Sequence, residues 1–418
     1  MSLSFPERLG QACTPLALLS GLALAGITVT APAQAAQTHL QPSLEASVEQ
    51  NTNRNLAINP ADEADITGYI VDAQLLWSYV TPQTETQVRP RVRFQNYPDD
   101  KEVQRSEQFL DFNTRHRATE RSTFDLIGRY SRQDSFNSEL GGAGFDDLDP
   151  DDPTEGGEGT ETLSGETRTR AQLRPGFTHE FSEVTGFFVG SVLETVRFDS
   201  DTRDRTEYSY LELRTLFMRQ LSPLTQLAIG PVASRYETRD DVNQTDSYGL
   251  ELNLEHRWSE LTQVGGGVFV RSSDVELTRG GVTESESSTD IGFDVNVLRR
   301  TETGRLRFTL GRTLRPSTNG NTVVRDEFRI QHDRDFSERL SMRTAVRAYT
   351  EDSIGSADSD RDQDHVRAEL RLTWMLTPTM FVRGGYEYTW RELERDGTSA
   401  KNHAAIVSFG YRGLARPR

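Results

Sequence analysis

Apolar and polar residues alternate with a period of two along most of this sequence. The alternation is clear in residues 69–79, 88–96, 248–258, 366–376 and 380–390. A period of two is that of a β-strand with one apolar face, because successive side chains point to opposite sides of the strand. The i, i+3, i+4 spacing of an amphipathic helix is almost absent. The sequence therefore predicts an all-β chain.

These segments are about 9 to 11 residues long, the length that a tilted strand needs to cross a bilayer. A hydrophobic content of 34% and a mean hydropathy of −0.63 exclude a bundle of membrane helices. They do not exclude a membrane barrel, because a barrel turns every second residue toward lipid and keeps its polar side chains in the lumen. The net charge of −17 argues against a nucleic-acid partner.

The N-terminal residues resemble a secretory signal. Arg8 precedes an apolar stretch from Leu16 to Val29, and an A-x-A cleavage pattern follows at residues 33–35. We predict a Sec signal peptide at 1–35 and a single barrel domain at 36–418, with no periplasmic or plug domain ahead of the barrel. The only cysteine, Cys13, falls in the signal, so the mature chain is expected to have no disulfide.

Counting the alternation gives about 18 strands, which start near residues 40, 68, 86, 106, 122, 169, 185, 207, 226, 247, 263, 288, 305, 323, 340, 365, 380 and 403. Short turns rich in Pro, Ser, Thr and Gly are predicted at 81–84, 118–121, 182–185, 222–225, 259–262, 302–304, 335–338 and 377–379. Longer polar loops are predicted at 51–66, 97–105, 133–167, 199–206, 238–246, 278–288, 316–322, 351–364 and 391–402. Strict alternation of short and long connections predicts a transmembrane antiparallel up-and-down β-barrel with periplasmic turns and extracellular loops.

Aromatic residues on the apolar face lie near the ends of the predicted strands, as in the girdles of membrane barrels. They are Tyr69, Trp77, Tyr79, Trp258, Trp374, Tyr388, Trp390 and Tyr411. For about 18 strands tilted by about 40°, we expect a backbone diameter of roughly 35 Å and a bore of roughly 15 to 25 Å. No repeat of fixed length, as a propeller or solenoid would have, is present.

The pattern resembles the outer-membrane β-barrel porins of Gram-negative bacteria, including those encoded with exopolysaccharide export systems. The resemblance rests on the signal peptide, the strand count, the Ser/Pro turns and a last strand with Ala405, Val407, Phe409 and Tyr411 on one face. It implies outer-membrane lipid and the barrel assembly machinery as partners, and no cofactor. The sequence departs from the usual aromatic C-terminus, because residues 413–418 follow Tyr411.

The face opposite the apolar one is rich in arginine, and we expect it to line the lumen. The predicted pore-lining residues are Arg89, Arg91, Arg93, Arg115, Arg129, Arg170, Arg174, Arg257, Arg305, Arg307, Arg329, Arg367, Arg371 and Arg383, with Arg325, Arg343 and Arg347 on the same face. Guanidinium groups stay charged and bind carboxylate or phosphate in a planar fork, so this wall suits anions. Alternatively, the arginines pair with lumen acids and brace the wall; the candidate acids are Asp111, Asp125, Glu251, Glu255, Glu327, Glu369 and Glu387.

The longest predicted loop, residues 133–167, contains eleven acids and no Lys or Arg. As the third long loop, it resembles the loop that folds into the lumen of general porins. It equally fits an acidic surface loop, because little apolar surface is available to hold it. Four of its acids match a calcium-loop pattern without the required glycine, namely Asp147, Asp149, Asp151 and Glu158. We predict no specific metal site, and only loose binding of divalent ions here and by the acids at 358–364.

Catalysis is not predicted. The seven histidines are His39, His116, His179, His256, His332, His365 and His403, and they are spread along the chain. By parity, His116, His179, His256 and His332 face lipid near strand ends. No G-x-S-x-G, H-E-x-x-H or Gly-rich phosphate motif is present.

Two functions remain open from the sequence. The first is an outer-membrane channel that passes anionic solutes, or an acidic exopolysaccharide, through an arginine-lined lumen. The second is a structural or surface-interaction barrel with a closed lumen. Arginines that mostly have carboxylate partners would favour the second function, and a strip of uncompensated arginines would favour the first.

Overall fold

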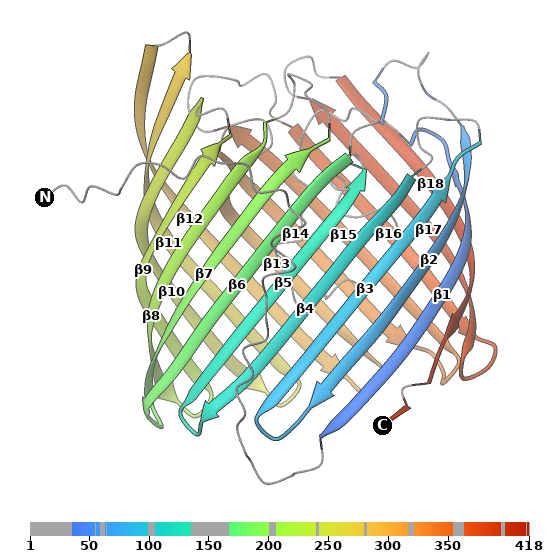
Figure 1. Cartoon of the computed structure of the whole chain (residues 1–418), viewed down its shortest axis with the longest axis horizontal. Helices are drawn as coiled ribbons and strands as arrows, with labels where there is room; N and C mark the ends of the chain where they lie inside the picture. The colour runs from blue at the N-terminus through green and yellow to red at the C-terminus, as the bar shows by residue number, and fades with distance from the viewer. Residues whose placement is uncertain are drawn as a thin grey trace, which may run out of the picture. The chain divides into compact units, whose positions relative to one another are not determined.

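The chain folds into one closed antiparallel barrel of eighteen long strands (Figure 1). The computed structural model describes residues 36–418 apart from 55, 59–62, 64, 99–104, 135–166, 200–205, 240–241, 280–281, 317–321, 354–362, 394–397, 415 and 418. The first nine strands are β1 (Gln37–Asn51), β2 (Ile66–Val80), β3 (Thr84–Asn96), β4 (Arg105–Thr119), β5 (Ser122–Asp134), β6 (Thr167–Ser182), β7 (Thr185–Phe198), β8 (Tyr208–Ser222) and β9 (Thr225–Thr238). The others are β10 (Asn243–Ser259), β11 (Thr262–Arg279), β12 (Val282–Thr301), β13 (Gly304–Pro316), β14 (Thr322–Asp335), β15 (Leu340–Ser353), β16 (Gln363–Met375), β17 (Met380–Leu393) and β18 (Thr398–Arg412). The predicted all-β up-and-down barrel and its strand count are confirmed.

The barrel closes by pairing of its first and last strands. β1 pairs with β18 from Ser43 opposite Arg412 to Asn51 opposite Ala404. A two-residue segment, β19 (Arg416–Pro417), pairs with β1 beyond this point. Closure leaves no open sheet edge, so the backbone of the wall can be satisfied within lipid. None of the described residues forms a helix long and apolar enough to span a membrane.

Eight short turns connect the strands at one end, which we call the turn end, and all eight lie where the sequence predicted them. In several of them a hydroxyl closes the turn. Thr81, Ser182, Ser337 and Thr377 each accept a hydrogen bond from the backbone N–H three residues later, at 2.8, 3.2, 3.1 and 3.0 Å. This bond explains the Ser/Thr content of the turns, since it replaces a backbone partner that a tight reversal lacks.

The opposite end, which we call the loop end, differs from the prediction most clearly at one connection. The predicted polar loop 278–288 is wrong, because β11 and β12 pair through to Arg279 opposite Val282. Only residues 280–281 lie between them, and the hairpin rises above the rest of the wall (the yellow strands in Figure 1). β18 also begins at Thr398 rather than near 403, and the strands contain 13 to 20 residues, more than the predicted 9 to 11. Strict alternation of short and long connections therefore does not hold.

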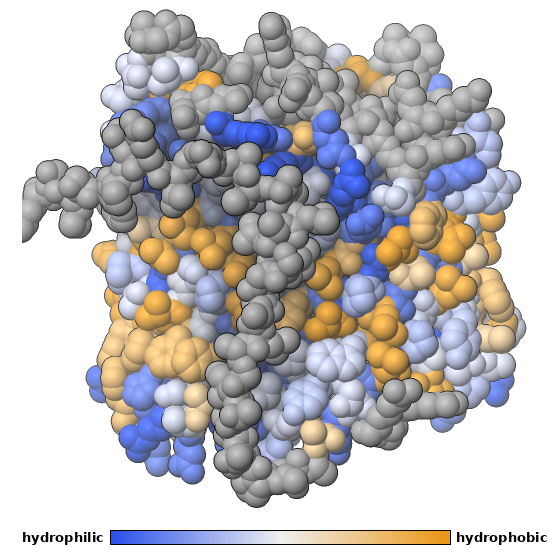
Figure 2. Space-filling model, viewed as in Figure 1, coloured by the Kyte–Doolittle hydropathy of each residue, from blue (hydrophilic) through white to orange (hydrophobic). Residues whose placement is uncertain are grey.

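The two faces of the wall have opposite character. Leu250, Ile291 and Val407 lie on the outside and are 61%, 67% and 62% exposed. Figure 2 shows hydrophobic residues gathered in a band across the middle of the visible face, with hydrophilic residues beyond it toward both ends. Such a band suits the hydrocarbon layer of a bilayer. The polar and charged side chains of the same strands point into the lumen, which is where a function must be sought.

Candidate functional site

The lumen face of β13–β17 carries more arginine than acid, and we call it the arginine sector. Its arginines are Arg305, Arg307, Arg315, Arg325, Arg329, Arg343, Arg347, Arg367, Arg371, Arg383 and Arg391. Its acids are Glu327, Asp333, Asp335, Glu351, Glu369 and Glu387. The strand register gathers the charges, because residues opposite one another on neighbouring strands point to the same face.

Two carboxylates of the arginine sector are each shared by two guanidinium groups. Glu327 Oε1 lies 2.7 Å from Arg329 Nη2 and 2.8 Å from Arg347 Nε. Asp333 accepts a hydrogen bond from Arg343 at 2.6 Å and lies 3.3 Å from Arg305. Each of these two carboxylates therefore holds two arginines in position along the wall.

The loop end of this sector is stiffened by a buried stack. The guanidinium carbon of Arg325 lies 4.3 Å from the ring centre of Tyr349, and Tyr349 stacks on His365 at 4.7 Å. Arg325 also pairs with Glu351. Arg325, Tyr349 and His365 are 1%, 4% and 1% exposed. A stack buried to this degree fixes side chains rather than offering them to a solute.

The predicted run Arg89, Arg91 and Arg93 on β3 is bound to acids. Arg89 lies 3.0 Å from Asp111, and Arg91 and Arg93 both contact Asp72. Arg91 and Arg93 are only 8% and 5% exposed. In this region the geometry matches the bracing alternative, in which arginines serve the wall.

The other predicted arginines differ in their surroundings. Five of them lie within 4.0 Å of an acid. The pairs are Arg115 with Asp125, Arg129 with Asp111, Arg170 with Glu194, Arg367 with Glu387, and Arg383 with Glu45. Arg371 is buried in the wall, and Arg257 is exposed at the turn end of β10. Arg174 and Arg307 line the cavity described below.

A contrasting surface lies on β10–β12, and we call it the acid–amide sector. It consists of Glu251, Asn253, Asp294 and Asn296, which lie over the buried glycines Gly265 and Gly267 of β11. A Cβ atom at position 267 would meet the Oδ1 atoms of Asn253 and Asp294, and one at 265 would meet Asn296. The glycines thus make the room that these polar side chains occupy.

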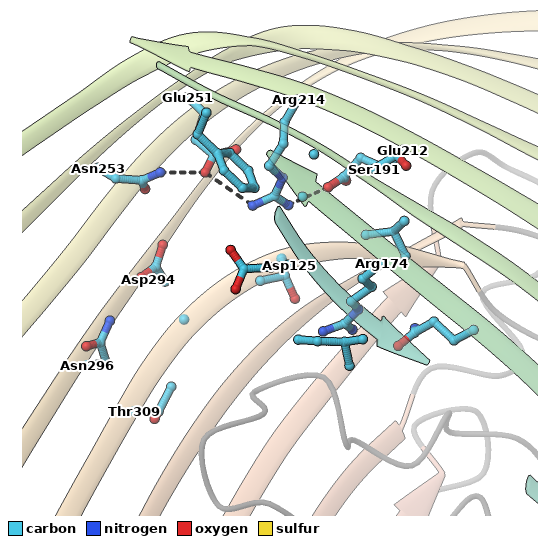
Figure 3. Close-up of a pocket in the computed structure, with 18 of the residues that line it drawn as sticks. Asp125, Arg174, Ser191, Glu212, Arg214, Glu251, Asn253, Asp294, Asn296 and Thr309 are labelled. Atoms are coloured by element: carbon cyan, nitrogen blue, oxygen red, sulfur yellow. Dashed lines mark hydrogen bonds and ion pairs between the residues drawn. The ribbon is translucent and has the colours of Figure 1, made fainter. Parts of the chain in front are cut away.

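A chain of contacts connects this sector to β8. Asn253 donates a hydrogen bond to Glu251 at 2.6 Å, and Arg214 lies 3.7 Å from Glu251. Arg214 also pairs with Glu212, which Arg271 contacts at 3.0 Å. Figure 3 shows Arg214 between the two glutamates. Arg214 and Arg271 were not among the predicted lumen arginines, because both faces of their strands carry apolar residues.

A cavity of about 1060 Å³ lies in the lumen, lined by β3–β8 and β10–β14. Its arginines include Arg115, Arg170, Arg174, Arg214, Arg271, Arg307, Arg315 and Arg329, and its acids include Asp125, Glu194, Glu212, Glu251, Asp294 and Glu327. In Figure 3, Arg174, Asp294 and Asn296 project into the same space. The cavity wall therefore presents guanidinium groups, carboxylates and amides to the same space.

The acidic segment and the calcium pattern cannot be assigned a geometry. Residues 135–166, with Asp147, Asp149, Asp151 and Glu158, lie outside the described residues. Within the described ranges, no group of three or more His, Cys, Asp or Glu side chains could hold a metal ion.

No protein-family model matches the sequence, and no curated protein matches it. Similar chain traces occur among solved Gram-negative outer-membrane porins and transporters. OccAB3 of Acinetobacter baumannii has 11% identity and a TM-score of 0.42, covering 90% of this chain and 99% of that one. OpdF of Pseudomonas aeruginosa, solved with glucuronate, has 10% identity and a TM-score of 0.44, covering 90% and 98%. The ferric citrate transporter FecA has 11% identity and a TM-score of 0.43, and this chain covers 60% of its length.

Likenesses of this degree assign neither a substrate nor a mechanism to this chain. Its location follows from its own geometry, because a closed wall of eighteen strands has an apolar outer belt and a polar lumen. The chain is a β-barrel of the bacterial outer membrane.

Proposed function

We propose that this barrel is a passive channel for small anionic solutes and that the arginine sector sets its preference for anions. The observation that carries the proposal is the composition of the arginine sector, whose described lumen positions hold more arginines than acids. A sector with a surplus of positive charge attracts anions into the pore.

The cavity sets a size for the solute. Its volume of about 1060 Å³ is in the range of sites for small molecules. An anion that enters would exchange part of its hydration shell for bonds from several guanidinium groups, among them Arg174, Arg307 and Arg329. Because each of these groups already has interactions within the wall, no single one would hold the anion tightly, which favours passage over trapping.

Solute flux into vesicles that contain the refolded barrel tests this function. Benzoate and benzylammonium have similar size and opposite charge. Subtracting their entry rates into protein-free vesicles removes passage of the neutral forms through lipid, so the remaining rates report the charge preference of the barrel. We expect benzoate to enter faster. Equal entry rates, or faster entry of benzylammonium, would contradict the proposal.

The same vesicles distinguish two further possible functions, a channel for an acidic polysaccharide and a structural barrel with a closed lumen. An acidic polysaccharide would use the same positive wall, and a linear polyuronate added to one side should then block benzoate entry. A structural barrel with a closed lumen is favoured by the many ion pairs, such as those of Arg91 and Arg93 with Asp72. That alternative predicts entry of neither probe from a correctly folded protein.

A further inference from the structure

The outward face of the barrel carries a row of basic residues at the turn end. Each lies two or three residues before the end of its strand, on six successive even-numbered strands: His116 on β4, His179 on β6, Arg219 on β8, His256 on β10, Arg299 on β12 and His332 on β14. Their register partners are outward residues such as Thr84, Phe187 and Leu227. We call these six residues the turn-end basic belt.

Three of the belt histidines have the same local geometry. The Nδ1 atoms of His116, His179 and His256 lie 2.8, 3.0 and 2.9 Å from a Thr or Ser hydroxyl on the preceding strand. The hydroxyls belong to Thr84, Ser122 and Thr225. This contact orients each ring through Nδ1 and leaves Nε2 on the opposite side of the ring. Recurrence on three separate hairpins makes it a repeated feature of the wall rather than one local accident.

The outward neighbours of the belt carry few charges. On the two flanking strands, His116 lies opposite Thr84 and Phe124, and His179 lies opposite Ser122 and Phe187. In the same way, His256 lies opposite Thr225 and Val264, and His332 lies opposite Leu306 and Thr344. Charged groups nearby along the chain are Arg334, the turn residues Glu120, Arg121, Glu183, Glu260, Glu302, Glu338 and Arg339, and the lumen-side neighbours Arg117, Glu180, Arg257, Arg300 and Asp333. Within the described part of the chain, neither Arg219 nor Arg299 forms an ion pair. The belt therefore has no acid on its own face to balance it.

The loop end of the same outer face is built differently. There Arg132 pairs with Asp199 at 2.6 Å, Arg235 with Asp246 at 2.7 Å, and Arg312 with Asp326 at 3.1 Å. These three loop-end cations thus have partners within the wall, whereas the belt residues face outward toward whatever surrounds the barrel. In a membrane, that surrounding at the level of the strand ends is the headgroup region.

We propose that the turn-end basic belt binds the phosphate groups of anionic phospholipids in the leaflet on the turn side. Phosphate oxygens accept strong hydrogen bonds from guanidinium and protonated imidazole. The belt is also placed at interfacial depth, since Trp258 stands 6.1 Å from the His256 ring and is 74% exposed. An indole in that position is typical of a membrane interface.

Native mass spectrometry of the refolded barrel, released from detergent with added phosphatidylglycerol or phosphatidylcholine, counts the retained lipids. We expect more phosphatidylglycerol than phosphatidylcholine, because phosphatidylglycerol has a net negative charge that phosphatidylcholine lacks. The triple variant His116→Gln, His179→Gln, His256→Gln should lower the retention of phosphatidylglycerol. The double variant Arg219→Gln, Arg299→Gln should weaken its retention by about fivefold for each charge lost.

His403 provides a matched control. It also faces outward and contacts a hydroxyl, that of Tyr386 at 2.7 Å, but it lies near the loop end. His403→Gln should leave lipid retention unchanged. Should the glutamine triple not fold, the same three positions changed to arginine give the reverse readout, with retention of phosphatidylglycerol rising above that of the unmodified barrel. Equal retention of the two lipids, no rise in the arginine variant, or an equal loss in His403→Gln would overturn the proposal.

Discussion

The arginine sector and the acid–amide sector are neighbouring parts of one lumen, yet they are built on opposite principles. On β13–β17, long guanidinium side chains outnumber carboxylates and share them, as Arg329 and Arg347 share Glu327. On β10–β12, short side chains such as Asp294 lie over the glycines of β11. The first sector holds positive charge in place, and the second provides space and negative charge. The contrast indicates that selectivity and room for the solute come from different strands.

Reversing charge in the arginine sector should have the largest effect on this contrast. In Arg307→Glu, Arg329→Glu the sector loses its positive surplus at the cavity wall, so we expect the barrel to change from anion to cation preference. The reversal potential of single channels under a salt gradient measures this change. Lys401→Glu, at an outward position of β18, should leave the sign unchanged. A double variant that still prefers anions would show that the sector does not set selectivity.

Removing a shared carboxylate should increase the difference in charge between the two sectors and make the barrel less stable. Glu327→Gln leaves Arg329 and Arg347 close together without their common acid. We expect stronger anion preference and a free energy of unfolding lower by about 2 to 3 kcal/mol, less than for a fully buried pair because these side chains keep some solvent contact. Urea titration of the barrel in vesicles gives the stability. No change in either quantity would mean that the two arginines do not depend on Glu327.

Removing negative charge from the acid–amide sector should also strengthen anion preference, but by less. Asp294→Asn removes a negative charge from the cavity and keeps the shape of the side chain. We expect the anion-to-cation permeability ratio to rise about twofold, since one charge contributes only part of the field in a wide pore. Folding should be unaffected. A fall in the ratio would contradict the assignment of opposite roles to the two sectors.

The smallest effect is expected from filling the glycine surface. In Gly267→Ala the new methyl group would displace Asn253 and Asp294 toward the cavity. We expect a modest decrease in single-channel conductance with unchanged ion preference. Gly384→Ala is a suitable control, because a Cβ at that position meets no atom within 4 Å. A change of ion preference in Gly267→Ala would show that the surface does more than provide space.

The period of two predicted most of the wall, because lipid imposes it on every strand that crosses the membrane. It failed at residues 278–288, where the hairpin between β11 and β12 is polar on both faces. A strand that extends beyond the hydrocarbon layer has no apolar face to reveal it. This one is held by its backbone ladder, from Val275 opposite Glu286 to Arg279 opposite Val282, and by a hydrogen bond between the hydroxyls of Thr278 and Thr283. Sequence periodicity is insensitive to such segments.

The lumen was harder to predict than the wall. Parity identified Arg307 and Arg329 as inward residues, but it missed Arg214 and Arg271, whose neighbours Leu216 and Phe269 are apolar and also point inward. Pair identities depend on the register between strands, which alternation does not specify. The sharing of Glu327 by two arginines could therefore be found only from the structure.

The reversal potential of the unmodified barrel in a planar bilayer, under a tenfold gradient of potassium chloride, is the most direct test of an anion channel governed by the arginine sector. The account predicts open channels whose potential has the sign of chloride preference. Channels that prefer potassium, or a correctly folded barrel that passes no current, would contradict it.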